Sequence, residues 1–223
     1  DCDGNGIQDL CEEDCNSNGV ADPCDIIDGN SIDDNGNGVP DECETPIFVI
    51  NEINADPSSN PDGTYADGDA NGDGVGNYGD DEFVEFVNYS GAAIDLGGWT
   101  LSDGAGVRHE FPIGTVLDDQ CAFVLFGGGT PTGDFGNSIV QTASSGALGL
   151  NNGGDTITLT DTDGNIVLSV TYGSEAGNNQ SITLVPDVYG TVFFPHADIA
   201  PDGALFSPGT RVDGSPLGTC EPP

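Results

Sequence analysis

Residues 82–102 read EFVEFVNYSGAAIDLGGWTLS and hold two short runs rich in aromatic and β-branched side chains, divided by a glycine-containing turn. Such side chains favour strands, whereas Gly, Asn and Asp favour the turns between them. Similar runs lie on both sides of this stretch, and Asp163-Gly164 joins two of them as a hairpin turn would. No window has helical periodicity. We therefore expect short strands at residues 47–54, 82–88, 98–102, 107–112, 121–126, 155–160, 165–172 and 181–185.

Many short strands with frequent turns are typical of a β-sandwich. We assign residues 46–223 to this mainly β domain. Cys121 begins one of the predicted strands and Cys220 lies near the end of the sequence, so we predict a disulfide between them. The residues expected in the core are Phe83, Phe86, Leu96, Trp99, Leu101 and Phe123.

A different pattern fills the arm at residues 1–45, where a twelve-residue unit recurs at 1–12, 14–25 and 33–44. Each unit has Asp at position 1, Asp or Asn at 3, Asn at 5, Gly at 6, an aliphatic residue at 7, Asp at 9 and an acid at 12. Calcium loops take side-chain oxygens at positions 1, 3, 5, 9 and 12 and a backbone carbonyl at 7. The expected ligands are Asp1, Asp3, Asn5, Ile7, Asp9 and Glu12, then Asp14, Asn16, Asn18, Val20, Asp22 and Asp25, and then Asp33, Asn35, Asn37, Val39, Asp41 and Glu44.

The spacing of these units does not suit EF-hands, because the gaps between them are too short for helix pairs. A dockerin, in which a helix follows each loop, also fits poorly. The remaining interpretation is an irregular string of loops with little hydrophobic core, which metal ions and disulfides must hold together.

A fourth loop of the same kind lies in an insertion at 55–81, between the first two predicted strands. A loop of this length needs a structural reason, and a calcium ion provides one. A solvated acidic loop is the alternative. The expected ligands are Asp69, Asn71, Asp73, Val75, Asn77 and Asp80, which brings the expected number of calcium ions to about four.

The net charge of −37, from 39 acidic residues against 2 basic ones, excludes proteins that bind nucleic acids or anionic membranes. Divalent cations would relieve the self-repulsion, and a high-salt habitat is the other explanation. The seven cysteines have no CxxC spacing and indicate disulfides, hence a secreted or cell-surface protein. No stretch reaches the ~18 apolar residues of a membrane span, so we expect no membrane insertion.

On these repeated motifs, residues 1–44 resemble thrombospondin type 3 repeats, which wrap calcium and are linked by disulfides. The resemblance implies the pairs Cys11–Cys15 and Cys24–Cys43, with Cys2 left for an upstream repeat. Pairing within units, Cys2–Cys11 and Cys15–Cys24, is the alternative. The third unit departs from the family, because Asp34 stands at a position that the family gives to Cys.

The domain that follows resembles a lamin tail domain over about residues 47–185, on the segments Asn51-Glu52-Ile53, Glu82–Glu85 with Asn88, and Leu96–Leu101. The resemblance implies an immunoglobulin-like sandwich that serves binding or architecture. We expect no enzymatic activity, because His109 and His196 lie in no recognisable catalytic motif.

The function expected from the sequence is that of an extracellular, calcium-stabilised structural or adhesive module of a cell surface, matrix or fibre. Its expected partners are calcium and either copies of itself, as in a homopolymer, or other surface and matrix proteins. One alternative is a non-catalytic accessory region of a larger secreted hydrolase. Another is a carbohydrate-binding module that uses exposed aromatic residues such as Tyr65, Tyr78 or Tyr189.

Overall fold

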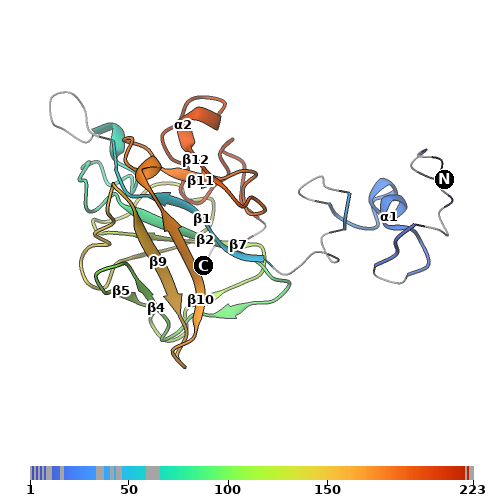
Figure 1. Ribbon diagram of the computed structural model, residues 1–223, viewed down its shortest axis with the longest axis horizontal. Helices are drawn as coiled ribbons and strands as arrows, with labels where there is room; N and C mark the ends of the chain where they lie inside the picture. Colours follow the sequence, from blue (N-terminus) through green and yellow to red (C-terminus); the bar gives the residue numbers. More distant parts are fainter. Residues whose placement is uncertain are drawn as a thin grey trace. The chain divides into compact units, whose positions relative to one another are not determined.

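The computed structural model divides the chain into two compact units, Asp1–Pro46 and Ile47–Pro223 (Figure 1). The residues that it describes are Cys2, Gly4, Gly6, Gln8, 12–15, 18–33, 38–40, Cys43, 47–58, 66–218 and Cys220. No helix among them is long and apolar enough to cross a membrane.

The first unit contains a helix, α1 (Asp22–Asp28), which the sequence analysis did not anticipate. Pro23 stands in its first turn, where the missing N–H is not needed. Gly29 ends the helix in the left-handed conformation, and its N–H faces the carbonyls of Asp25 and Ile26. The helix is seven residues long and has no amphipathic repeat, so Pro23 and Gly29 are its only local sequence signals.

The larger sheet of the second unit has the order β12-β11-β1-β2-β7-β8. All neighbours are antiparallel except β7 and β8, which are parallel. Its strands are β1 (Ile47–Asn54), β2 (Phe83–Tyr89), β7 (Cys121–Phe126), β8 (Ile139–Thr142), β11 (Ile182–Leu184) and β12 (Phe193–Pro195).

A second sheet has the order β10-β9-β4-β5 (Figure 1). A two-stranded sheet joins β3 to β6. Their strands are β3 (Ile94–Asp95), β4 (Thr100–Ser102), β5 (Val107–Glu110), β6 (Val116–Leu117), β9 (Asp155–Thr160) and β10 (Ile166–Tyr172). The short helical turns are η3 (Ala66–Gly68), η4 (Ser174–Ala176) and α2 (His196–Ile199).

The main core joins these two sheets, and it explains why residues 82–102 determine the fold. Val84 and Phe86 of β2 are fully buried and belong to one cluster with Leu101 of β4 and Leu159 of β9. Phe83 of the same strand is fully buried in a different cluster with Phe126. Strand β2 is therefore covered on both faces, and its sequence is a nearly continuous apolar run rather than an alternating one.

The mainly β sandwich expected from the sequence is confirmed, with differences at the strand ends. The predicted segments 98–102 and 107–112 begin or end two residues away from β4 and β5. Strands β3, β6, β8 and β12, which are two to four residues long, were not predicted. Runs of that length become strands only when a neighbour provides the hydrogen bonds. Among the expected core residues, Trp99 is only half-buried and packs against the edge of the core.

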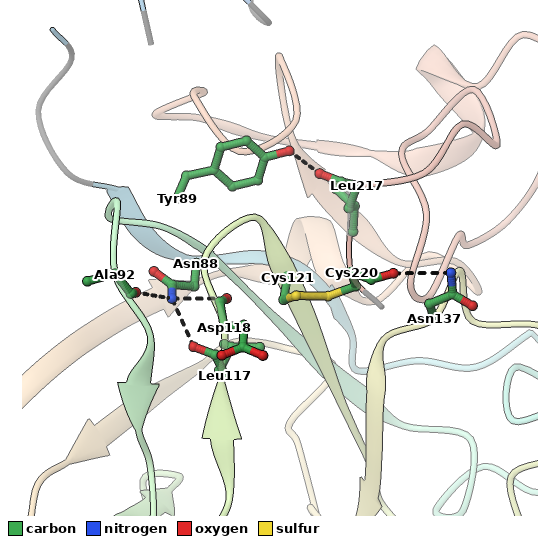
Figure 2. The surroundings of a disulfide bond; sticks show 9 residues. All are labelled: Asn88, Tyr89, Ala92, Leu117, Asp118, Cys121, Asn137, Leu217 and Cys220. Atoms are coloured by element: carbon green, nitrogen blue, oxygen red, sulfur yellow. Dashed lines mark hydrogen bonds between the residues drawn. A yellow bond between two sulfur atoms is a disulfide. The ribbon is translucent and has the colours of Figure 1, made fainter. Parts of the chain in front are cut away.

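The disulfide Cys121–Cys220 ties the end of the chain to the start of β7, as expected from the sequence (Figure 2). Nearby, the amide of Asn137 donates to the carbonyl of Cys220, and the Tyr89 hydroxyl donates to the carbonyl of Leu217. The amide of buried Asn88 donates to the carbonyls of Ala92, Leu117 and Asp118 (Figure 2). These contacts fix the C-terminal segment and the β2–β3 turn against the sheet.

Candidate metal-binding loops

The loop at 69–80 is closed by hydrogen bonds between the residues predicted as ligands and the backbone. The N–H of Gly74 donates to Asp69 Oδ2 at 2.9 Å, and the N–H of Val75 donates to Asp73 Oδ1 at 2.9 Å. The Asn77 amide donates to Asp80 Oδ2 at 2.9 Å. These contacts turn the side chains of the predicted ligand residues toward the inside of the loop.

Asp81 directly follows the predicted ligand positions 69–80, and its side chain holds the backbone of the loop. Its fully buried carboxylate accepts the N–H of Asn71 at 3.0 Å and the N–H of Asn77 at 2.7 Å. Burial raises the pKa of Asp81 and the charges of Asp69 and Asp73 raise it further, although the two N–H donors oppose the shift. The carboxylates of this loop therefore lie close enough to repel one another.

A segment distant in sequence, residues 127–133, completes this site. The N–H of Thr130 donates to Asp73 Oδ2 at 3.0 Å, and the Thr132 hydroxyl donates to the carbonyl of Gly72 at 2.7 Å. Gly129 has a φ of 73°, which favours glycine, and a Cβ there would meet the side chains of Asn71 and Asp73. The glycine-rich stretch after β7 therefore serves as a wall of the acidic loop.

The second loop, at 14–25, brings together four of its predicted ligand positions. Asp14 Oδ2 accepts the N–H of Gly19 at 2.9 Å, and the Asn18 amide donates to Asp25 Oδ2 at 2.6 Å. Asp22 accepts the N–H of Cys15 at 3.0 Å. Asp22 and Asp25 are both buried and belong to α1, so the end of this loop is helical.

One backbone feature is common to the loops. The glycine at position 6 has a positive φ in each of them: 90° at Gly6, 90° at Gly19, 84° at Gly38 and 85° at Gly74. The N–H of this glycine donates to the carboxylate at position 1 in three loops, at 2.9 Å in Gly19–Asp14, 2.8 Å in Gly38–Asp33 and 2.9 Å in Gly74–Asp69. The side chains at position 7 are exposed in Val20, Val39 and Val75, which suits a position that would contribute only its carbonyl.

Many of the predicted ligands lie outside the described residues, and so does the predicted disulfide partner Cys11. These ligands are Asp1, Asp3, Asn5, Ile7, Asp9, Asn16, Asn35, Asn37, Asp41 and Glu44. Within the described part of the chain, only Cys15, Asp22 and Cys43 form a group of three Cys, His or carboxylate atoms within 4.8 Å of one another. Cys15 and Cys43 are joined as a disulfide, so this group is not a metal centre.

The disulfides of the arm differ from both expected patterns. Cys2 pairs with Cys24 and Cys15 pairs with Cys43, with Cα–Cα distances of 5.6 and 5.8 Å. The pairs Cys11–Cys15 and Cys24–Cys43 are therefore wrong, and so are the alternative pairs Cys2–Cys11 and Cys15–Cys24. Each observed bond spans more than twenty residues and ties different units together. Cys24 is buried in α1 and bonded to Cys2, which leaves Cys43 to pair with Cys15.

A buried acidic network on the outer face of the large sheet was not found from the sequence. Glu52 and Glu85 are fully buried on neighbouring strands. Glu52 accepts hydrogen bonds from the Ser181 hydroxyl and from Ser207, whose hydroxyl also contacts His196 Nε2 at 2.8 Å. Burial raises the pKa of Glu52 and that of Glu85, and the charge of Glu52 raises the pKa of Glu85 further. Composition alone did not reveal these acids as buried, because only the structure shows that the outer face of the large sheet is covered as well.

Both histidines have structural partners. His109 Nδ1 accepts the N–H of Ser144 at 3.2 Å, so its Nε2 carries the proton and donates to Gln141 Oε1 at 3.0 Å. Burial lowers the pKa of His109, in keeping with a neutral ring. His196 is fully buried, and its Nδ1 contacts the carbonyl of Ala204 at 2.9 Å.

The two packed sheets and the disulfide-tied end define an immunoglobulin-like β-sandwich. The chain belongs to the lamin tail domain family, because the model of that family, Lamin Tail Domain, matches residues 45–174. This family is an immunoglobulin-like, non-catalytic domain family. A search of curated proteins gave no match to this sequence.

Proposed function

We propose that this chain is an extracellular structural or adhesive module in which bound calcium acts as a folding element. The observation that carries the proposal is the common geometry of its acidic loops, in which the position-6 glycine turns its N–H onto the position-1 carboxylate. A twelve-residue ladder with this turn is the arrangement that wraps a calcium ion. The arm would then resemble thrombospondin type 3 repeats in chemistry as well as in sequence.

The donor atoms of the fourth loop fit a hard cation. They are oxygens of carboxylates, amides and one carbonyl, and calcium takes six to eight such ligands. Asp69 Oδ1 is buried and receives no hydrogen bond from the part of the chain that the structure describes. A buried carboxylate oxygen without a donor is costly unless a cation compensates it. The residues that would hold the ion are Asp69, Asn71, Asp73, Val75, Asn77 and Asp80.

The overall charge supports the same proposal. A chain with a net charge of −37 has few internal cations to offset its carboxylates. The guanidinium of Arg108 is already committed to Asp103, at 2.6 Å. Calcium bound at the loops would reduce the repulsion where the acids are most concentrated. Disulfides within both units support an oxidising, extracellular location.

The test is hydrogen exchange and thermal unfolding of the whole chain in calcium, in magnesium at equal concentration, and in EDTA. Calcium is expected to raise the unfolding temperature and to slow exchange at the amides of Gly74 and Thr130. Magnesium controls for screening, because it fits such cages poorly. Equal stability and equal exchange in calcium and in EDTA would contradict the proposal.

A matched pair of variants localises the effect. Asp69→Asn removes a carboxylate from the predicted ligand set, whereas Asp163→Asn removes one from the exposed β9–β10 turn. Each variant changes the net charge by one unit. The calcium-dependent protection at Gly74 is expected to be lost in Asp69→Asn and kept in Asp163→Asn.

A further inference from the structure

Strand β10 forms one edge of the four-stranded sheet, and β9 is its neighbour within that sheet (Figure 1). An edge strand presents backbone N–H and C=O groups that can pair with another strand. Proteins protect such edges with charged side chains, prolines or very short strands. Strand β10 runs for seven residues, IVLSVTY, without a charge or a proline. Its register with β9 shifts between Ile166 and Leu168, and a β-bulge can also protect an edge, but this irregularity lies at one end of the strand and leaves Leu168–Tyr172 regularly paired.

The other edges of the two sheets are better protected. Strand β5 carries Arg108 and Glu110, and β12 is three residues long and ends at Pro195. Strand β8 is four residues long, and each of its residues is half-buried. On β10, by contrast, Ile166 is 67% exposed and Val167 is 38% exposed. Of the four edges, β10 is therefore the one best suited to pair with a further strand.

Strand β10 and the segment that follows it are also poor in charge, although the β9–β10 turn carries Asp161 and Asp163. From Gly164 to Pro195 the only charged residues are Glu175 and Asp187, although the chain has 39 acidic residues. Asp187 is only 7% exposed. Within this range Val185, Val192 and Phe194 are exposed apolar side chains. Loss of charge with retention of apolar side chains is the composition of a protein interface.

An apolar groove of about 190 Å³ lies beside this edge. It is lined by residues of β1, β10, β11 and β12, among them Val49, Leu168, Val170, Leu184 and Phe193. If another chain pairs with β10, apolar side chains of that chain could enter the groove at the rim of the contact.

From these observations we propose that β10 pairs with β10 of a second copy of this chain. The charge argument identifies the partner. A neutral or basic partner could bind to the acidic surfaces of this chain. A second copy carries the same negative charge, so it would be repelled there and can approach only at a surface without charge. This inference deepens the proposed structural role by naming the partner and the surface, and it does not require calcium at any loop.

The geometry of the strand suits a two-fold contact. Antiparallel pairing about Ser169 sets Leu168 against Val170, so aliphatic and β-branched side chains meet across the axis within the regular part of the strand. Such a contact is isologous, which is the commonest form of homodimer. It would join two four-stranded sheets into one continuous sheet.

The test is sedimentation of the full chain over a wide concentration range, both in calcium and in EDTA. The wild-type chain is expected to form dimers, more strongly as salt screens the acidic repulsion. Val167→Glu is expected to shift it to monomers. Ile113→Glu, at a site that is 88% exposed and lies outside the strands, adds the same charge and should leave the dimer intact.

Two further measurements guard against a variant that merely unfolds. Ser169→Glu places the charge at the exposed centre of the strand and should also give monomers. In the wild-type chain, hydrogen exchange at β10 amides should slow as concentration rises. The proposal is overturned if the wild type stays monomeric, if β10 exchange is independent of concentration, or if Val167→Glu and Ile113→Glu weaken association equally. Dimers that persist in EDTA would show that pairing at β10 does not need calcium, so the dimer proposal can succeed even if the calcium proposal fails.

Discussion

Glu52 and Glu85 face each other across β1 and β2, and both side chains are fully buried. Two carboxylates in this position cannot both be ionised without a large cost, and the charge of Glu52 is one of the causes that raise the pKa of Glu85. Glu85 accepts the Asn51 amide and the N–H of Gly209, and Glu52 accepts groups of Ser181 and Ser207. The pair thus connects the sheet to the C-terminal segment, which lies beyond the residues that match the family.

This pair predicts how stability depends on pH. Because the folded pKa of Glu85 lies well above its ordinary value of 4.5, the folded state binds this proton more tightly than the unfolded chain does. The contribution of Glu85 to stability is therefore fully present below pH 4.5 and is lost as pH rises through the folded pKa. Glu85→Gln introduces a neutral isostere, so the free energy of unfolding of this variant should fall less steeply with rising pH than that of the wild type. Urea unfolding in EDTA at a series of pH values measures it.

The control for this experiment is Glu110→Gln, because Glu110 is an exposed acid on β5. Its pH dependence should follow that of the wild type. A Glu85→Gln variant with the wild-type slope would contradict the assignment.

The disulfide Cys121–Cys220 predicts a large loss of stability on its removal. It closes a loop with a sequence separation of 99 residues. Its absence from the double variant Cys121→Ser/Cys220→Ser should destabilise the second unit by about 2–5 kcal/mol. Denaturant unfolding followed by the fluorescence of Trp99 measures this. The matched double variant Cys15→Ser/Cys43→Ser lies in the first unit and should leave that transition unchanged.

Non-reducing proteolysis with mass spectrometry tests the pairing in the arm. We expect linked peptides that contain Cys2 with Cys24 and Cys15 with Cys43. Recovery of a peptide pair joining Cys24 to Cys43 would show that the arm follows the pattern implied by thrombospondin type 3 repeats instead.

At Asn88, we expect Asn88→Asp to destabilise the fold more than Asn88→Ala does. Its amide nitrogen donates to three carbonyls in the β2–β3 and β6–β7 region (Figure 2). Asn88→Ala leaves buried acceptors unpaired and should lower the free energy of unfolding by about 1–3 kcal/mol. Asn88→Asp places an anion against those carbonyls and should be worse. Thermal unfolding of both variants at neutral pH decides this, and equal losses would show that the donor role is unimportant.

The sequence predicted the longer strands because their composition is local information. Strands β2, β7 and β9 are rich in β-branched and aromatic residues and begin within a residue or so of the expected positions. Strand β8 could not be found in this way, because it exists through parallel pairing with β7. Helix α1 was missed because it is seven residues long and has no apolar periodicity, and its local signals are only Pro23 in the first turn and Gly29 after its end.

For the candidate site, the sequence determined the ladder of acidic residues and the glycine that each loop needs at position 6. A residue with a side chain is strained at a positive φ, so the presence of glycine at position 6 predicts the turn. Only the tertiary structure decided which cysteines pair, that residues 127–133 close the loop at 69–80, and that Glu52 lies against Glu85. Those relationships join residues far apart along the chain, and chain folding brings them together in ways that local composition does not encode.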